Sequence, residues 1–176
     1  GSNILFRDNG IKGAVIKLGG EFSYIKKLDK DTLDVGAATL DRAVANFAKN
    51  NNIGNFEFLS CIPGSIGGAV IMNSGCYNND ISKILLSIKV IDINYFNEIE
   101  IPKKEIDFFY RGTSLQESLI ITSVKLKGLT LEKKEIEKKQ SNLIAKKKLS
   151  QPSQVKTCGS TFKNIIKDKK AWMFIK

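Results

Sequence analysis

The sequence predicts an α+β fold, because short apolar runs typical of strands are interspersed with separate stretches typical of helices. Four runs predict strands, at residues 14–18, 32–35, 87–93 and 119–126, and a hairpin is expected through 94–101. The length of 176 residues and the hydrophobic content of 42% suit one compact domain, or one domain and a fragment of another. No apolar run approaches the roughly 18 residues of a membrane span.

A first helix is expected from about residue 40 to residue 50. Thr39 is the expected N-cap, and Asp41 falls in the first turn. Five apolar residues recur at helical spacing and should form its buried stripe: Leu40, Ala43, Val44, Phe47 and Ala48. The helix should end within the three asparagines at 50–52, with Gly54 just beyond.

A second helix is expected after Thr130, where the chain becomes rich in charge. Glutamates come first and lysines 146–148 come last, an order that complements the helix dipole. The apolar stripe is thin, comprising Leu129, Ile136, Leu143 and Ile144. One face of this helix should therefore pack, and the rest should be solvated.

The net charge of +10 requires that nucleic-acid binding be considered. Only Arg7, Arg42 and Arg111 are arginines among 28 basic residues, so the basic character comes mainly from lysine. A nucleic-acid module would need a clustered basic face interleaved with aromatic residues, and no such pattern is visible. A solvated lysine surface is the better interpretation, with attraction for phosphorylated small molecules as a secondary effect.

Histidine is absent, and the three cysteines, Cys61, Cys76 and Cys158, are widely spaced without a C-x-x-C pair. This pattern predicts no metal site and no disulfide framework, but reduced thiols in a cytoplasmic protein. Proton transfer would have to rely on Ser, Tyr, Lys, Cys or a carboxylate, since the commonest general base is missing.

The most informative stretch is Ile62-Pro63-Gly64-Ser65-Ile66-Gly67-Gly68-Ala69, followed by Val70-Ile71-Met72-Asn73-Ser74-Gly75. Three glycines within five positions allow a tight turn that brings several N–H groups close to one anion. The alternative is a glycine-rich bend that only lets two elements pack closely. The loop therefore predicts a phosphate site but does not establish one.

Further motifs flank this loop: Gly1-Ser2-Asn3 before it, then Tyr110-Arg111-Gly112-Thr113-Ser114 and Gly159-Ser160-Thr161-Phe162-Lys163-Asn164. In this order the motifs resemble the UDP-N-acetylenolpyruvoylglucosamine reductase (MurB) family across essentially the whole chain. The resemblance implies an FAD-binding domain of the vanillyl-alcohol-oxidase/PCMH type with the start of a substrate-binding domain. It assigns residues 1–128 to an FAD-binding domain lacking its N-terminal part, 129–152 to a charged helix or linker, and 153–176 to a truncated substrate domain.

The activity implied by this resemblance is a two-step reduction in peptidoglycan precursor synthesis. NADPH reduces noncovalent FAD, which then reduces UDP-N-acetylglucosamine enolpyruvate to UDP-N-acetylmuramate. The partners would be the UDP-sugar enolpyruvyl ether and NADPH, with no nucleic acid and no membrane, in a monomer. A histidyl–flavin link is impossible without histidine.

Two residues would carry the chemistry. Arg111 would stabilise the enolate-like charge that hydride addition builds on the substrate carboxylate, a task suited to a permanently protonated guanidinium. Ser160 would supply the proton to the adjacent carbon if neighbouring cations lowered its pKa. Without the motifs, a structural ion pair and a turn serine would be the default interpretations.

The remaining site residues come from the same motifs. Lys163 and Asn164 would bind substrate. Cofactor binding is assigned to Gly1, Ser2, Asn3, Pro63, Gly64, Ser65, Gly67, Gly68, Ala69 and Asn73. No residue is assigned to a metal.

The chain also departs from the family pattern. Cys61 stands where a glycine is usual, Ile165 replaces a proline, and Cys76 and Asn78 alter the run after Asn73. The family's carboxyl-terminal glutamate has no counterpart before Lys176. We therefore expect this chain alone not to turn over. The alternatives to the reductase function are an inactive fragment of that enzyme and another flavin oxidoreductase of the same fold.

Overall fold

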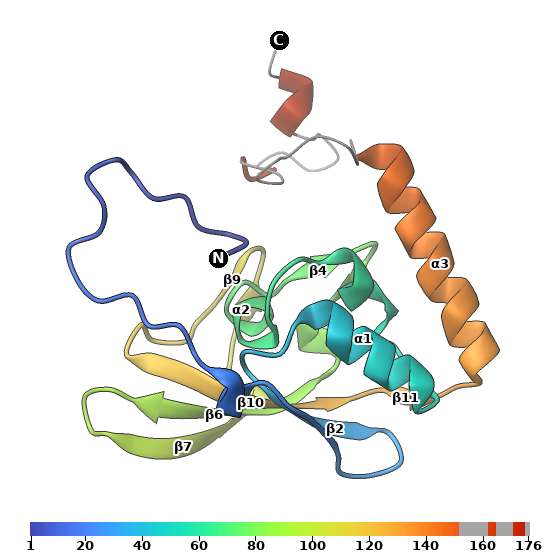
Figure 1. Ribbon diagram of the computed structural model, residues 1–176, viewed down its shortest axis with the longest axis horizontal. Coiled ribbons are helices and arrows are strands. Elements are labelled where there is room, and N and C mark those ends of the chain that lie inside the picture. Colours follow the sequence, from blue (N-terminus) through green and yellow to red (C-terminus); the bar gives the residue numbers. More distant parts are fainter. Residues whose placement is uncertain (152–161, 165–170, 175–176) are drawn as a thin grey trace.

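The computed structural model of the chain describes residues 1–151, 162–164 and 171–174. Within these residues, the largest sheet has five antiparallel strands (Figure 1). Their order across the sheet is β1 (Ile25–Lys27), β2 (Thr32–Gly36), β10 (Leu119–Lys127), β6 (Leu85–Asp92) and β7 (Asn97–Pro102). The expected α+β class and the strands at 32–35, 87–93 and 119–126 are confirmed, as is the hairpin that β6 and β7 form.

One apolar row crosses all five strands of this sheet. Direct cross-strand partners place Ile25, Val35, Val124, Ile88 and Ile101 side by side. Because side chains alternate between the two faces of a strand, this row defines the core face. The three central members of the row have no exposed surface.

The described residues form three α-helices: α1 (Asp41–Asn50), α2 (Ile66–Ile71) and α3 (Lys133–Ser150). The first two lie over the core face of the sheet, and α3 stands to one side of them (Figure 1). The short helix α2 packs against β2 and β10, and α1 packs against the 3-10 helix η2 (Glu57–Cys61). The charged helix α3 contacts η2 through buried Ile136 and Gln140. Among the described residues, no helix combines the length and apolar character that crossing a bilayer requires.

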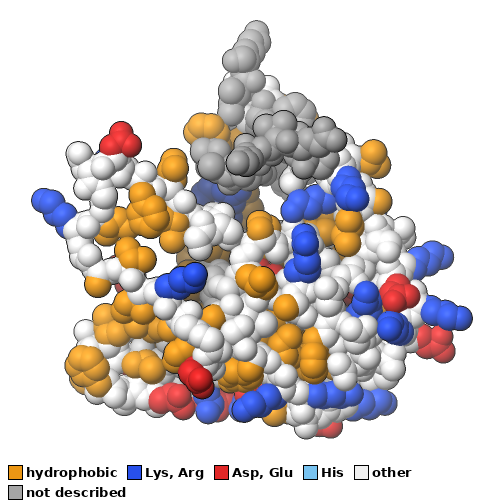
Figure 2. All heavy atoms as spheres, in the orientation of Figure 1, with side chains coloured by type: hydrophobic (Ala, Val, Ile, Leu, Met, Phe, Trp, Pro, Cys, Tyr) orange, Lys and Arg blue, Asp and Glu red, His pale blue; other side chains and the backbone are white. Residues whose placement is uncertain are grey.

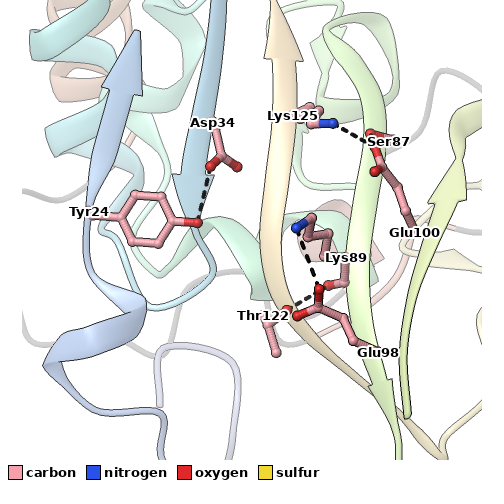
Figure 3. Close-up of polar contacts among 8 residues, drawn as sticks. All are labelled: Tyr24, Asp34, Ser87, Lys89, Glu98, Glu100, Thr122 and Lys125. Carbon is pink, nitrogen blue, oxygen red and sulfur yellow. Dashed lines mark hydrogen bonds and ion pairs between the residues drawn. The ribbon is translucent and has the colours of Figure 1, made fainter. Parts of the chain in front are cut away.

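The opposite face of the sheet is polar and carries paired charges (Figure 3). Lys125 Nζ lies 2.8 Å from Glu100 Oε1, which also accepts a hydrogen bond from Ser87 Oγ. Hydrogen bonds from Lys125 and Ser87 lower the pKa of Glu100. Exposed pairs of this kind add little stability, so this face is solvated and the helical face is where a site can be enclosed.

Pairs of two-residue strands and further 3-10 helices complete the described structure. The strand pairs are β11 (Leu129–Thr130) with β3 (Ile53–Gly54), β4 (Gly75–Cys76) with β5 (Asn79–Asp80), and β8 (Phe108–Phe109) with β9 (Gly112–Thr113). The 3-10 helices are η1 (Gly20–Phe22), η3 (Ile81–Lys83), η4 (Lys103–Glu105) and η5 (Ala171–Phe174), besides η2.

The predicted buried strand at residues 14–18 is wrong. This segment is irregular, and the side chains of Val15 and Ile16 are 66% and 67% exposed. An apolar run becomes a strand only where another strand satisfies its backbone, and the edge beside β2 is occupied by β1, whose sequence is Ile-Lys-Lys. Ile4, Leu5 and Phe6 are exposed as well, along the extended N-terminal segment in Figure 1.

Both ends of α1 differ in detail from the expectation. Leu40 occupies the N-cap position and is 62% exposed, while Thr39 Oγ1 donates instead to the carbonyl of Tyr24. The helix ends at Asn50, and Asn52 takes the left-handed conformation with φ +60°. Its buried apolar residues are Val44, Ala45 and Ala48, so Ala45 takes the place of Ala43 in the stripe on the side that packs against η2. Leu129 lies in β11 rather than in α3.

The two adjacent glycines of α2 provide a test of its packing. A Cβ on Gly67 would lie 2.9 Å from the Cβ of Ala37, whereas a Cβ on Gly68 would meet only Ser65 Oγ, at 3.7 Å. We expect Gly67→Ala to lower the free energy of unfolding by about 1–3 kcal/mol through overpacking. Gly68→Ala should change it by less than about 1 kcal/mol and in the stabilising direction. Chemical denaturation of the two variants checks this, and equal losses would contradict it.

Candidate functional site

The glycine-rich loop is anchored to the segment that connects β2 to α1. The amide of Asp41 donates to the Gly64 carbonyl at 3.1 Å, and the amide of Ile66 donates to the Thr39 carbonyl at 2.9 Å. These bonds flank an isolated antiparallel bridge between Leu40 and Ser65. The loop is therefore held in place before any ligand binds, with Gly64 at φ +134°, a conformation that other residues rarely adopt.

Only part of the loop's backbone is available to an anion. The Gly67 amide donates to the Ala37 carbonyl at 3.0 Å, and the Ala69 amide donates to the Ser65 carbonyl at 2.9 Å. Within the described residues, the amides of Gly64, Ser65 and Gly68 have no acceptor. Gly68 is also exposed, and a Cβ there would meet only Ser65 Oγ, at an ordinary contact distance of 3.7 Å. These three positions fit a diphosphate, whereas Gly67 serves packing.

The N-terminal motif lies against this loop. Ser2 Oγ donates to the Pro63 carbonyl at 3.0 Å. A Cβ on Gly64 would lie 2.8 Å from Ser2 Oγ. The chain therefore brings together two of the segments predicted to bind the cofactor, although about sixty residues separate them in sequence. Gly1 and Asn3 are exposed beside Ser2.

The hairpin of β8 and β9 places Arg111 near the other end of α2. Tyr110 and Arg111 form the two-residue turn, with Arg111 at φ +61° and its guanidinium 5.7 Å from the centroid of the Tyr110 ring. Thr113 Oγ1 donates to the carbonyl of Ile71, the last residue of α2, at 3.4 Å. The glycine loop and the arginine hairpin are thus attached to opposite ends of one short helix.

Asn164 brings the last motif to the same hairpin. Its backbone amide donates to Tyr110 Oη at 3.4 Å, and its side-chain Oδ1 accepts the Ala171 amide at 2.8 Å. Lys163 is exposed. Ser160 lies outside the described residues, so its expected role as proton donor stays a prediction.

Asp41 is a feature of the site that sequence reasoning treated only as a helix-start signal. Its side chain is 1% exposed, and neither carboxylate oxygen has a hydrogen-bond partner among the described residues. A Cβ on Gly64 would lie 3.6 Å from Asp41 Oδ2, so the acid is directly beneath the loop. Burial raises the pKa of Asp41 to about 7. A neutral carboxyl repels a bound phosphate less than a carboxylate does.

Two cysteines lie just outside the loop, one in η2 and one in β4. Cys61 and Cys76 are free thiols, and Cys76 Sγ donates to the carbonyl of Phe58 at 3.4 Å. Burial raises the pKa of Cys61 and raises that of Cys76 to about 12, so neither is a ready nucleophile. Among the described residues, no cluster of His, Cys, Asp or Glu could hold a metal ion.

Comparison with known proteins identifies the domain around this loop. Residues 1–94 match the family model described as "FAD binding domain". The chain belongs to this FAD-binding family. FAD is therefore the cofactor that the loop amides would hold, in accord with the three positions that lack protein acceptors.

The most similar proteins carry one name. A "UDP-N-acetylenolpyruvoylglucosamine reductase" of Pelagibacter ubique is 47% identical over the whole chain, and one of Wolbachia sp. (strain wRi) is 40% identical over 99% of it. The chain covers 59% of each of these proteins. The crystal structure of the MurB of Thermus caldophilus superposes with a TM-score of 0.82 at 32% identity, covering 93% of this chain and 58% of that one. The resemblance seen in the sequence is confirmed.

The buried acid of this FAD-binding domain predicts a pH dependence of stability. The folded-state pKa of Asp41, about 7, lies above the ordinary value of 3.8, so the folded chain binds a proton that the unfolded chain releases. This contribution is complete below about pH 4 and is lost as pH rises through about 7. We expect Asp41→Asn, which stays neutral, to remove a decline in unfolding free energy between about pH 4 and pH 7.

Chemical denaturation at a series of pH values measures this decline in wild type and variant. The absence of histidine removes the side chain that would otherwise dominate this range. Parallel pH profiles for the two proteins would contradict the assignment.

Proposed function

We propose that the protein containing this chain is an NADPH-driven flavoenzyme that reduces UDP-N-acetylglucosamine enolpyruvate to UDP-N-acetylmuramate. The observation that carries this proposal is the attachment of the glycine loop and the Arg111 hairpin to the two ends of α2. The loop belongs to an FAD-binding domain, and the hairpin carries Arg111 near the other end of the same helix. We place the enzyme in the cytoplasm, as a monomer, on the basis of the resemblance and the free thiols Cys61 and Cys76.

The residues of this chain would act on the substrate as well as on the cofactor. FAD, when bound, supplies the hydride to the alkene. Arg111 would pair with the substrate carboxylate and stabilise the negative charge that grows there, with a planar fork that a lysine cannot reproduce. Asn164 and Lys163 would contact the UDP-sugar, and Ser160 would donate the proton to the neighbouring carbon.

We also propose the division of the chain that the sequence suggested. Residues 1–128 form the cofactor domain, 129–152 the charged connection, and 153–176 the first part of a substrate domain. The contact of Asn164 with Tyr110 supports this arrangement, because it brings the third segment to the edge of the first. A chain limited to residues 1–176 would lack turnover if a carboxylate outside it completes the catalytic group.

Another flavin oxidoreductase of the same fold is the competing proposal. Such an enzyme would share the glycine loop but would have no use for an arginine directed at an enolpyruvyl carboxylate. The two proposals are separated by the oxidising substrate. Only the proposed enzyme should reoxidise its reduced flavin faster with UDP-N-acetylglucosamine enolpyruvate than with unrelated alkenes or quinones.

The role of Arg111 can be tested by measuring the two half-reactions separately. In the protein expressed from its complete reading frame, Arg111→Lys should slow reoxidation of the flavin by the enolpyruvyl substrate by about 10²–10³-fold. Reduction of FAD by NADPH should change by less than about threefold, since no charge builds on a carboxylate in that step. Stopped-flow absorbance of the flavin resolves both steps. Equal slowing of the two would mean that Arg111 has a structural role.

The open side of Gly68 provides a test of the cofactor site. Gly68→Val should lower FAD affinity at least about tenfold, because the side chain would occupy the space that a phosphate needs beside the Gly68 and Ser65 amides. Gly19→Val, at another open glycine, is the control and should retain FAD. Flavin fluorescence titration gives both affinities, with far-UV circular dichroism as the check on folding. Full FAD retention by Gly68→Val would rule out this placement of the diphosphate.

A further inference from the structure

We infer that Asn73 is a positioning residue that holds the Arg111 turn, and not a direct ligand of the cofactor. The family resemblance assigned Asn73 to cofactor binding because it follows the glycine loop. Its contacts instead connect the end of α2 to the hairpin that carries Arg111. This inference rests on the proposed role of Arg111 in the reaction.

The side-chain amide of Asn73 is engaged at both ends by protein backbone. Nδ2 donates to the carbonyl of Phe109 at 3.3 Å, and Oδ1 accepts the amide of Ser82 at 3.4 Å. The residue itself is fixed directly after α2, where its backbone amide donates to the Val70 carbonyl at 3.0 Å and its φ is +41°. Asn73 therefore links three segments, α2, η3 and β8.

The hairpin needs this support because it cannot stabilise itself. Each of its strands has two residues, and isolated hairpins of any length are marginal in water. Arg111 adds the cost of a left-handed conformation at a residue with a side chain, roughly 1 kcal/mol or more. Such a conformation persists only where surrounding contacts impose it.

Those contacts lie on both sides of the turn. Phe109, whose carbonyl accepts from Asn73, immediately precedes Tyr110 and Arg111. Thr113, on the other strand, donates to the carbonyl of Ile71. One bond leads to the last residue of α2 and the other to Asn73, just beyond its C-cap, so the helix that positions the glycine loop also positions Arg111. Displacement of a catalytic group by about 1 Å can cost about 100-fold in rate.

Asn73→Asp is the sharpest variant, because it is isosteric and keeps the acceptor for Ser82 but removes the donor to Phe109. In the complete protein, we expect flavin reoxidation by the enolpyruvyl substrate to slow by about 10–100-fold. FAD affinity and the NADPH half-reaction should change by less than about threefold. Ser82→Ala is the matched control, since it leaves the Ser82 backbone amide that bonds Asn73 intact and should match wild type.

A double-mutant cycle with Arg111→Lys separates positioning from independent effects. If Asn73 acts through Arg111, Asn73→Asp should slow an Arg111→Lys enzyme by less than about threefold. Full multiplication of the two losses would overturn the inference. So would a loss of FAD affinity of tenfold or more in Asn73→Asp, which would make Asn73 a cofactor ligand.

Hydrogen exchange of the amides at residues 107–114 tests the same contact without any turnover. Exchange should be faster in Asn73→Asp than in Ser82→Ala, because the first variant releases the hairpin. Equal exchange in the two variants overturns the inference. A wild-type protein that does not reduce the enolpyruvyl substrate overturns the proposed function instead, and the exchange experiment then decides whether Asn73 holds the hairpin.

Discussion

The arrangement of this site depends on how α2 is tied to the end of β2 and the start of α1. Three backbone groups between residues 37 and 41 pair with the loop and the first turn of α2, through bonds to Gly64, Ile66 and Gly67. Backbone pairing leaves little freedom, since each buried amide or carbonyl that lost its partner would cost about 1–3 kcal/mol. The short helix therefore has one position on the sheet. That position fixes where the loop before the helix and the hairpin attached to its end lie.

The same attachment explains the buried acid. Because the Asp41 amide reaches the Gly64 carbonyl, the side chain at this position is drawn under the loop and loses its water. An aspartate at a helix start is normally stabilised as an anion by the dipole. Here desolvation dominates, and the pKa rises to about 7. The neighbouring amides would hold a diphosphate, so a side chain that becomes neutral by binding a proton is favoured at this position.

Sequence reasoning succeeded where one physical signal decided the outcome. Strands β2, β6 and β10 were predictable from their apolar runs, and each run has partner strands in the sheet. The run at 14–18 has the same composition, but local sequence does not reveal whether a partner strand exists. The motifs indicated the glycine loop and Arg111, whereas the functions of Asn73 and Gly67 depend on contacts with residues distant in sequence. The sequence around an asparagine that follows a helix looks the same whether its side-chain amide binds a ligand or a backbone carbonyl.

Helix α3 connects the glycine loop to the segment proposed to bind substrate. Gln140 donates to Ser60, and Lys147 donates to the Cys61 carbonyl, so the helix is attached to η2 immediately before the glycine loop (Figure 2 shows lysines over this side). The chain that follows α3 returns Asn164 to Tyr110, beside Arg111. The charged connection is thus attached to the residues that lead into the loop. Asn164, in the segment proposed to bind substrate, contacts the arginine hairpin. A substitution in η2 would disturb both positions, which makes this short helix, rather than the charged surface of α3, the sensitive part of the connection.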